Sequence, residues 1–348
     1  MPHFSGGTVD NSSLMAKERL IWADSLKGWL MVLVIIGHAI QSLLSDGCND
    51  NHVWNLIYSF HMPAFMAVSG WLAYRGMIPK IDYISTVKRR GMQLLIPYFV
   101  WSSIQFVLSG NYSIENLSKM ILYPDAYLWF LWVLFWICVL FNLAQLISEK
   151  CKINEIITIG CFCAILLVLM VGAEIRMFGF QFLAYYFLFY TLGYCLHKYD
   201  WKLLSSWTFL VPSALLWFFL AWGWTMHGLP SWLPAIPHVP STLLQYAYRG
   251  FTALVSIVVL IGAAPKLLNG KGKLNTFISG VGIISLGMYT GHLLFLGLIK
   301  RLLLYLSPAI NTWLAIIIIS VIIFILAYIL IKLLEKNKNT ARIFLGKI

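Results

Sequence analysis

The sequence predicts an all-α fold: a polytopic transmembrane helical bundle of about ten spanning helices, with both termini cytoplasmic. Three observations predict it: the apolar composition, the recurrence of long apolar stretches, and the placement of the basic residues. Of the 348 residues, 60% are hydrophobic and 11% are charged, and the mean hydropathy is +0.80. A soluble domain carries about 25% charged residues, so lipid must be the solvent for most of this apolar surface.

Ten apolar stretches account for the predicted spans, because a transmembrane helix needs about 20 mostly apolar residues. The stretches are 25–44, 53–74, 92–108, 127–147, 156–172, 177–196, 207–225, 243–264, 277–299 and 312–334. Short linkers join them, so we expect one membrane domain with two tails. The parts are a cytoplasmic N-terminal tail (1–20), a transmembrane domain (21–334) and a basic cytoplasmic C-terminal tail (335–348).

The basic residues set the predicted orientation. With a cytoplasmic amino terminus, 20 of the 25 Lys and Arg fall in inside segments, as the positive-inside rule requires. The five that fall outside are Lys119, Arg176, Arg249, Lys300 and Arg301. We therefore interpret the net charge of +12 as a topology signal, with anionic lipid headgroups rather than nucleic acid as its partner.

The N-terminal residues and the cysteines argue against two features, a cleavable signal peptide and a metal or disulfide framework. Residues 1–20 are polar and lack the apolar region of a cleavable signal, so insertion relies on the first span. Cys161 and Cys163 form a C-x-C pair without matching His or Cys partners. Neither a metal site nor a disulfide framework is expected from that pattern.

A polar stripe on the first span is the leading candidate for function, because ionisable groups inside a membrane are costly. Lys27 and His38 are 11 residues apart, about three helical turns, and Asp24 precedes Lys27 by three residues. The stripe rises about 21 Å, so it starts near the cytoplasmic surface and ends in the outer half of the bilayer. In the alternative interpretation, Asp24 and Lys27 are an interfacial pair and His38 bonds a backbone carbonyl.

Two further histidines are expected at a similar depth. His61 lies roughly 12 Å inside a span that runs inward, and His292 lies in the outer half of a span that runs outward. Three imidazoles from three helices at one depth predict a shared polar pocket. Each could instead be a separate structural hydrogen bonder.

The ordered motifs resemble those of the acyltransferase-3 family of bacterial inner-membrane acyltransferases. Asp24, Lys27 and His38 match its acidic–basic–His pattern, with lysine where arginine is commoner. The other matches are Ser59–Pro63, the Phe-x-x-x-Ser-Gly of Phe65–Gly70, the basic cluster Lys88–Arg90 ahead of Leu94–Tyr98, Trp129–Leu131, Gly193–Tyr194 and Ser285–His292. The family often has a second arginine four residues before the proline, where this chain has Gln93.

The resemblance implies transfer of an acyl group, most often acetyl, from cytoplasmic acyl-CoA to a hydroxyl of an envelope glycan or lipid-linked sugar. Acyl-CoA would be a co-substrate, with no bound cofactor, in a multi-pass protein of the bacterial inner membrane. The acceptor, the acyl group and the oligomeric state stay open.

The residues divide into three groups under this interpretation. Asp24, Lys27 and His38 are the predicted catalytic group, with His38 as general base or, alternatively, as an acyl-imidazole nucleophile. Lys27 pairs with Asp24 or contacts the donor. The predicted substrate-binding residues, which include the candidates for oxyanion stabilisation, are His61, Ser69, Tyr289 and His292. The predicted donor-binding residues are Lys88, Arg89 and Arg90, which could instead be topology determinants only.

The alternative from another class is a proton-coupled transporter or flippase of a glycan or small metabolite, since intramembrane His, Lys and Asp also mark proton transport. Such proteins often contain pseudo-symmetric halves. No internal repeat is evident in the sequence, and His38 has no counterpart in the sixth span. These features favour the enzyme.

Overall fold

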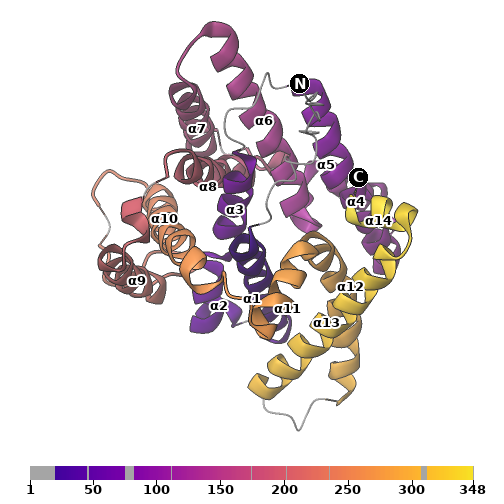
Figure 1. Cartoon of the computed structure of the whole chain (residues 1–348). Helices are drawn as coiled ribbons and strands as arrows, with labels where there is room; N and C mark the ends of the chain where they lie inside the picture. Colours follow the sequence, from indigo (N-terminus) through magenta and orange to yellow (C-terminus); the bar gives the residue numbers. More distant parts are fainter. Residues whose placement is uncertain are drawn as a thin grey trace, which may run out of the picture.

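The computed structural model describes residues 20–44, 47–74, 82–110, 112–173, 175–200, 202–234, 236–306 and 312–347, and all regular structure in these ranges is helical (Figure 1). The α-helices are α1 (Ile21–Leu43), α2 (His52–Tyr58), α3 (His61–Ala73), α4 (Tyr83–Ser109), α5 (Ile114–Leu122), α6 (Trp129–Cys151), α7 (Glu155–Gly172), α8 (Phe180–Lys198), α9 (Trp207–Trp222), α10 (Ser241–Leu267), α11 (Lys273–Ile283), α12 (Ser285–Leu306), α13 (Thr312–Glu335) and α14 (Lys338–Leu345). Short 3₁₀ turns are η2 (Cys48–Asp50), η3 (Pro124–Ala126), η4 (Met177–Gly179) and η5 (Lys202–Ser205). The predicted N-terminal tail lies almost wholly outside the described residues.

The predicted polytopic helical bundle is confirmed, but the count of spans differs. Within the described residues, seven helical stretches are long and apolar enough to cross a membrane, or eight if the bent pair α11–α12 is one span. The prediction of ten also included α8 and α9. Helix α9 has only 16 residues, and α8 carries Gln181, several tyrosines and a His-Lys end, which lower its apolar character. The cytoplasmic location of both termini stays a prediction.

Two helices depart from the predicted boundaries in ways that shape the site. The third span was expected to begin at residue 92, but α4 begins at Tyr83, so the basic cluster lies on a helix and not in a loop. The span expected at 277–299 is broken: α11 and the first part of α12 meet at an angle of 80° beside Ile284. A hydropathy window detects the length of an apolar stretch but not a change of direction within it.

Glycines allow two pairs of helices to pack backbone against backbone. A Cβ on Gly70 would meet the carbonyl of Tyr190, and one on Gly193 would meet the carbonyl of Ala67, so α3 and α8 are in direct contact. Gly28 and Gly282 likewise bring the backbones of α1 and α11 into direct contact. Small residues at such crossings let transmembrane helices associate closely. These contacts fix α1, α3 and α11, which carry much of the candidate site.

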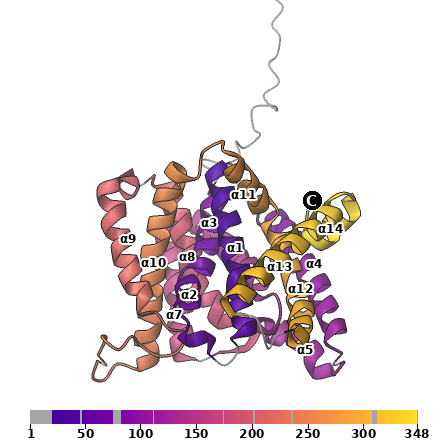
Figure 2. The ribbon, with the colours of Figure 1, turned by 90° about the horizontal axis from the view of Figure 1, so that it is seen from below.

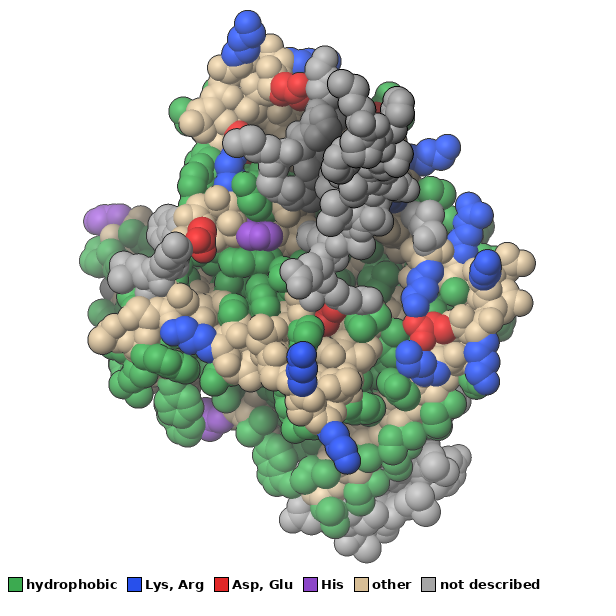
Figure 3. Space-filling view, viewed as in Figure 1, with side chains coloured by type: hydrophobic (Ala, Val, Ile, Leu, Met, Phe, Trp, Pro, Cys, Tyr) green, Lys and Arg blue, Asp and Glu red, His purple; other side chains and the backbone are tan. Residues whose placement is uncertain are grey.

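The bundle has one face rich in basic side chains, which we call the basic face (Figure 3). On this face Lys and Arg gather over the region where α4 and α14 lie, while apolar side chains are most frequent toward the left and lower edges of the view. Turned by 90°, the molecule shows α11 and α14 at this end of the bundle and α5 at the opposite end (Figure 2). The segment expected as a basic tail therefore includes a helix, α14, packed against the bundle beside α4.

Candidate active site

A cavity of about 300 Å³ lies beside the bend between α11 and α12. Helices α1, α3, α4, α6, α8, α11 and α12 and the end of α14 contribute to it. Its lining residues are Lys27, Met62, Phe65, Ser69, Leu72, Arg90, Gln93, Leu94, Phe130, Leu134, Cys138, Tyr190, Ile283, Ser285, Leu286, Tyr289, Leu345, Gly346 and Lys347. The predicted residues Lys27, Ser69, Arg90 and Tyr289 thus meet in one cavity, although they come from four different helices.

The charges that line this cavity are all positive. Lys27, Arg90 and Lys347 belong to the lining, and no described carboxylate does. Lys27 pairs with Asp24, whose carboxylate oxygen lies 2.8 Å from the ammonium nitrogen, as predicted for this stripe. Lys347 pairs with Glu335. Two of the three lining cations thus already pair with carboxylates outside the lining, and an anionic ligand in the cavity would add further contacts to these cations and to Arg90.

The start of α12 adds backbone donors to the same cavity. Ser285 and Leu286 line it, and the first intrahelical bond of α12 joins the N–H of Met288 to the carbonyl of Ile284. The preceding N–H groups of a helix have no carbonyl within the helix to accept from them. Such a terminus attracts negative charge. The break at Ile284 thus turns a spanning segment into a helix that begins inside the protein.

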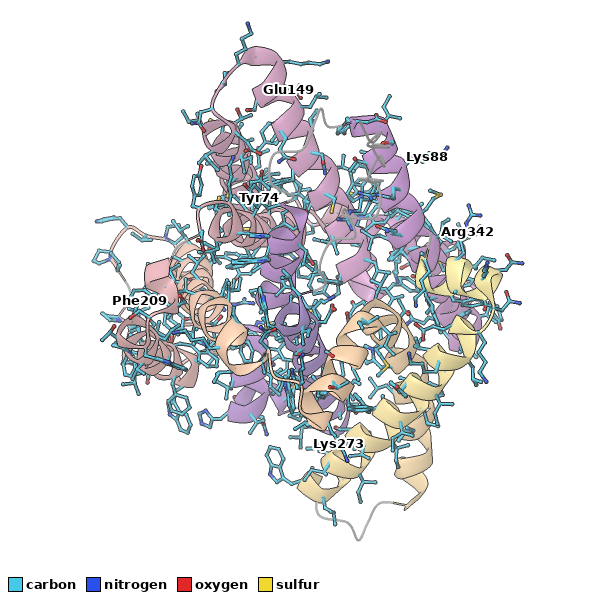
Figure 4. The ribbon with its side chains drawn as sticks, in the orientation of Figure 1. Tyr74, Lys88, Glu149, Phe209, Lys273 and Arg342 are labelled. Atoms are coloured by element: carbon cyan, nitrogen blue, oxygen red, sulfur yellow. The ribbon has the colours of Figure 1, made fainter. Side chains whose placement is uncertain are left out.

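The predicted basic cluster divides between the cavity and the surface. Arg90 is half-buried, lines the cavity and donates to Gln93 Oε1 at 3.3 Å. Lys88 is exposed and Arg89 is half-buried, and neither lines the cavity. Figure 4 labels Lys88 on the outer side of α4, near Arg342 of α14. Gln93 occupies the place where the resembling family often has arginine, and it lies in the cavity beside Arg90.

The three predicted histidines converge, but outside this cavity. The ring centroids of His38 and His292 are 5.2 Å apart, and His38 also interacts electrostatically with His61. His61 and His292 are buried and His38 is half-buried. We call these three residues the histidine cluster. The rings of His38 and His292 therefore meet, whereas a pocket shared by all three histidines stays a prediction, and none of the three lines the cavity.

Two members of the cluster bond backbone carbonyls: His61 bonds one on the preceding helix, α2, and His292 bonds one on its own helix, α12. Nδ1 of His61 lies 2.7 Å from the carbonyl oxygen of Ile57, and Nδ1 of His292 lies 3.2 Å from that of Met288. A carbonyl oxygen only accepts, so each Nδ1 carries the proton. In a neutral ring the lone pair is then on Nε2. Nε2 of His292 is buried without a hydrogen-bond partner among the described residues.

Tyr289 joins the two regions. Its side chain lines the cavity, and its ring centroid lies 5.8 Å from that of His292 and 5.4 Å from that of Phe130. Ser69 also lines the cavity, where its hydroxyl donates to the carbonyl of Phe65 at 2.9 Å. Tyr289 is thus a lining residue of the cavity whose ring lies beside the histidine cluster.

The sequence interpretation missed the contribution of residues 345–347. Leu345, Gly346 and Lys347 line the cavity although they are distant in sequence from every other lining residue. The one available signal was the alternation of charge and apolar residues in 338–345, which is typical of an amphipathic helix. A segment of eight residues is too short for that pattern to show where it packs.

Comparison with known proteins agrees with this arrangement of motifs. A family model described as an acyltransferase domain matches residues 20–332. The chain belongs to the acyltransferase-3 family. The match ends before α14, so the family model does not include residues 345–347.

Two curated relatives match part of the chain. The nodulation protein NolL of Mesorhizobium japonicum is 29% identical over 218 residues, which cover 58% of this chain and 56% of that protein. NolL of Sinorhizobium fredii is 32% identical over 193 residues, which cover 51% of this chain and 49% of that protein. The chain thus matches about half the length of these relatives. No solved structure matches.

Proposed function

We propose that this protein is an integral membrane O-acyltransferase of the bacterial inner membrane, with its basic face toward the cytoplasm. It moves an acyl group, most often acetyl in this family, from acyl-CoA to a hydroxyl of an envelope glycan or lipid-linked sugar. One observation carries the proposal: three cations and the start of α12 line a cavity that also includes Tyr289, and the ring of Tyr289 lies beside His292, which meets His38. Membership of the acyltransferase-3 family supports it.

The cavity supports the donor half of the reaction. Coenzyme A carries several phosphate charges, and Lys27, Arg90 and the first N–H groups of α12 supply charge-assisted donors for them. The apolar lining around Phe65 and Phe130 suits the pantetheine arm. The thioester at the tip of that arm then reaches Tyr289. Lys88 has no part in this proposal, because it is exposed on the outer side of α4.

The histidine cluster supports the proton transfer. His38 removes the proton of the acceptor hydroxyl while the hydroxyl oxygen attacks the carbonyl carbon of the thioester. The tetrahedral intermediate collapses when its carbon–sulfur bond breaks, and the leaving thiolate takes the proton from the His38 imidazolium. The products are the O-acyl ester and free CoA.

Tyr289 is the best-placed donor for the developing oxyanion, because it lines the cavity and lies beside His292. A neutral His292 has its proton on Nδ1, bonded to Met288, so its Nε2 accepts and does not donate. His61 and His292 are then acceptors for the sugar hydroxyls, whereas Ser69 stays a second candidate for the oxyanion.

The test is transfer from labelled acetyl-CoA by the purified protein in nanodiscs, supplied with an envelope glycan extract. We expect CoA release that depends on the acceptor and label that appears on the glycan. Uptake of labelled glycan into sealed proteoliposomes without acylation would instead support the transporter alternative. Mass spectrometry of envelope glycans from a deletion strain identifies the acceptor by its lost acetyl groups.

A further inference from the structure

The chain segment that follows α13 is fastened to the bundle at several points. The side chain of Asn337 caps α14 by accepting from the N–H of Asn339 at 2.8 Å. The indole N–H of Trp101 on α4 donates to the carbonyl of Phe344 at 2.9 Å. Leu345 is buried against Gly287 of α12, where it leaves no room for a larger residue. The end of α14 is thus held between α4 and α12.

Gly346 brings this segment into the cavity. Its φ of +61° is in the left-handed region that favours glycine. A Cβ at this position would also collide with the carbonyl oxygen of Gln93. Only glycine therefore lets the backbone at position 346 approach Gln93, which accepts a hydrogen bond from Arg90. The result is that Lys347 reaches the cavity, whose lining also includes Lys27 and Arg90.

Lys347 is paired in a way that leaves capacity for a second anion. Its ammonium contacts Glu335, but Glu335 also accepts from Lys332 at 2.8 Å, so one carboxylate serves two lysines. The Lys347 side chain is 47% exposed. An ammonium has three N–H donors, and one carboxylate oxygen does not use them all.

We propose that Leu345–Lys347 form one wall of the acyl-donor site and that Lys347 binds a phosphate of the CoA donor. The inference rests on the proposed function and names a ligand residue beyond the predicted cluster. Arg90 and Lys347 then hold the nucleotide from α4 and from the α14 end, and Glu335 keeps its pairing with Lys332 when the donor binds.

The test measures binding of CoA to the purified full chain in nanodiscs by titration calorimetry, in the absence of an acceptor. Lys347→Ala should weaken CoA binding about tenfold, the usual effect of losing one charge-assisted hydrogen bond. Lys338→Ala, at the exposed start of the same helix, is the matched control and should leave binding unchanged. Equal affinities for wild type and Lys347→Ala would overturn the proposal.

Glu335→Gln separates a ligand role from a structural role. If Lys347 only ties α14 to α13, Lys347→Ala and Glu335→Gln break the same ion pair and should weaken CoA binding alike. If Lys347 binds phosphate, Glu335→Gln frees the ammonium, and CoA binding should stay equal or become tighter. A parallel loss in both variants would contradict the phosphate role.

A phosphate-free donor completes the test. Acetyl-pantetheine has the arm of CoA without its phosphates, so Lys347→Ala should not change the KM for this donor while it raises the KM for acetyl-CoA. An equal rise for both donors would refute the phosphate contact. A wild-type protein that binds no CoA would instead refute the proposed function, so the two failures are distinguishable.

Discussion

The cavity and the histidine cluster lie on either side of Tyr289, and they differ in charge, access and the way their residues are held. The cavity contains cations from three separate parts of the chain, and Lys347 at its edge is half exposed. In the cluster, His61 and His292 are buried, and each bonds a backbone carbonyl, His61 on α2 and His292 on its own helix α12. The first region can bind a large anion, and the second can only handle a proton or a hydroxyl.

This difference separates two tasks that an acyltransferase must combine. Recognition of CoA needs several charges over a wide area, whereas general base catalysis needs one imidazole whose lone pair is free. Placing both on one surface would let the cations repel an imidazolium and disfavour its formation. Variants of the two regions should therefore give opposite kinetic signatures, one in kcat and the other in KM.

The largest effect is expected at the histidine cluster. His38→Ala should lower kcat for acyl transfer by about 10²- to 10⁴-fold, the usual contribution of a general base, and leave CoA binding unchanged. Single-turnover transfer and CoA titration on the same preparation measure both quantities. His52→Ala, which removes an exposed imidazole at the start of α2, is the control. Transfer at the wild-type rate by His38→Ala would reject His38 as the base.

The second-largest effect is expected at Tyr289, between the cavity and the histidine cluster. Tyr289→Phe should lower kcat by about 10²-fold, because it removes one donor to the oxyanion, and should leave the KM for acetyl-CoA nearly unchanged. Tyr328→Phe, which removes a hydroxyl on α13 that does not line the cavity, is the matched control. If Tyr289→Phe changes KM and not kcat, Tyr289 belongs to the donor site and the proposed boundary is misplaced.

The sequence predicted which residues belong to the cavity and to the histidine cluster better than it predicted that the two regions are separate. The stripe of Asp24, Lys27 and His38 follows from helical periodicity, and the 2.8 Å ion pair between Asp24 and Lys27 agrees with both interpretations of it. The meeting of His38 and His292 follows from their equal predicted depth, and the 5.2 Å between their ring centroids agrees with it, whereas a pocket shared with His61 stays a prediction. Their catalytic roles stay predictions.

The rest depended on features that local patterns do not encode. The residues on both sides of the break at Ile284 line the cavity, yet residues 277–299 read as one apolar span because hydropathy carries no direction. The basic cluster divides because α4 starts at Tyr83, and helical rotation then places Arg90 inward and Lys88 outward. Lys347 reaches the cavity only through the tertiary contacts of α14. Each of these is a fact of packing, which a single sequence does not show.

A moderate effect is expected in the cavity. Arg90→Gln should raise the KM for acetyl-CoA about tenfold with kcat little changed, because one charged contact to the donor is lost in the ground state and the transition state alike. Steady-state kinetics at saturating acceptor separate the two constants. An unchanged KM would favour the interpretation that the cluster only sets topology, and a large loss of kcat would mean that the cavity takes part in chemistry.

The smallest effect is expected at Lys88, two residues before Arg90 on α4. Lys88→Gln removes a charge of the same sign from the same predicted cluster, but Lys88 is exposed and does not line the cavity. At a distance in screened solvent its contribution to CoA binding is small, so the KM should change by less than about twofold at physiological salt. The pair Arg90→Gln and Lys88→Gln thus tests the position of the cavity and not merely its charge. If both variants raise KM equally, CoA is held by the general field of the basic face, and the separation between a built cavity and its charged surroundings is wrong.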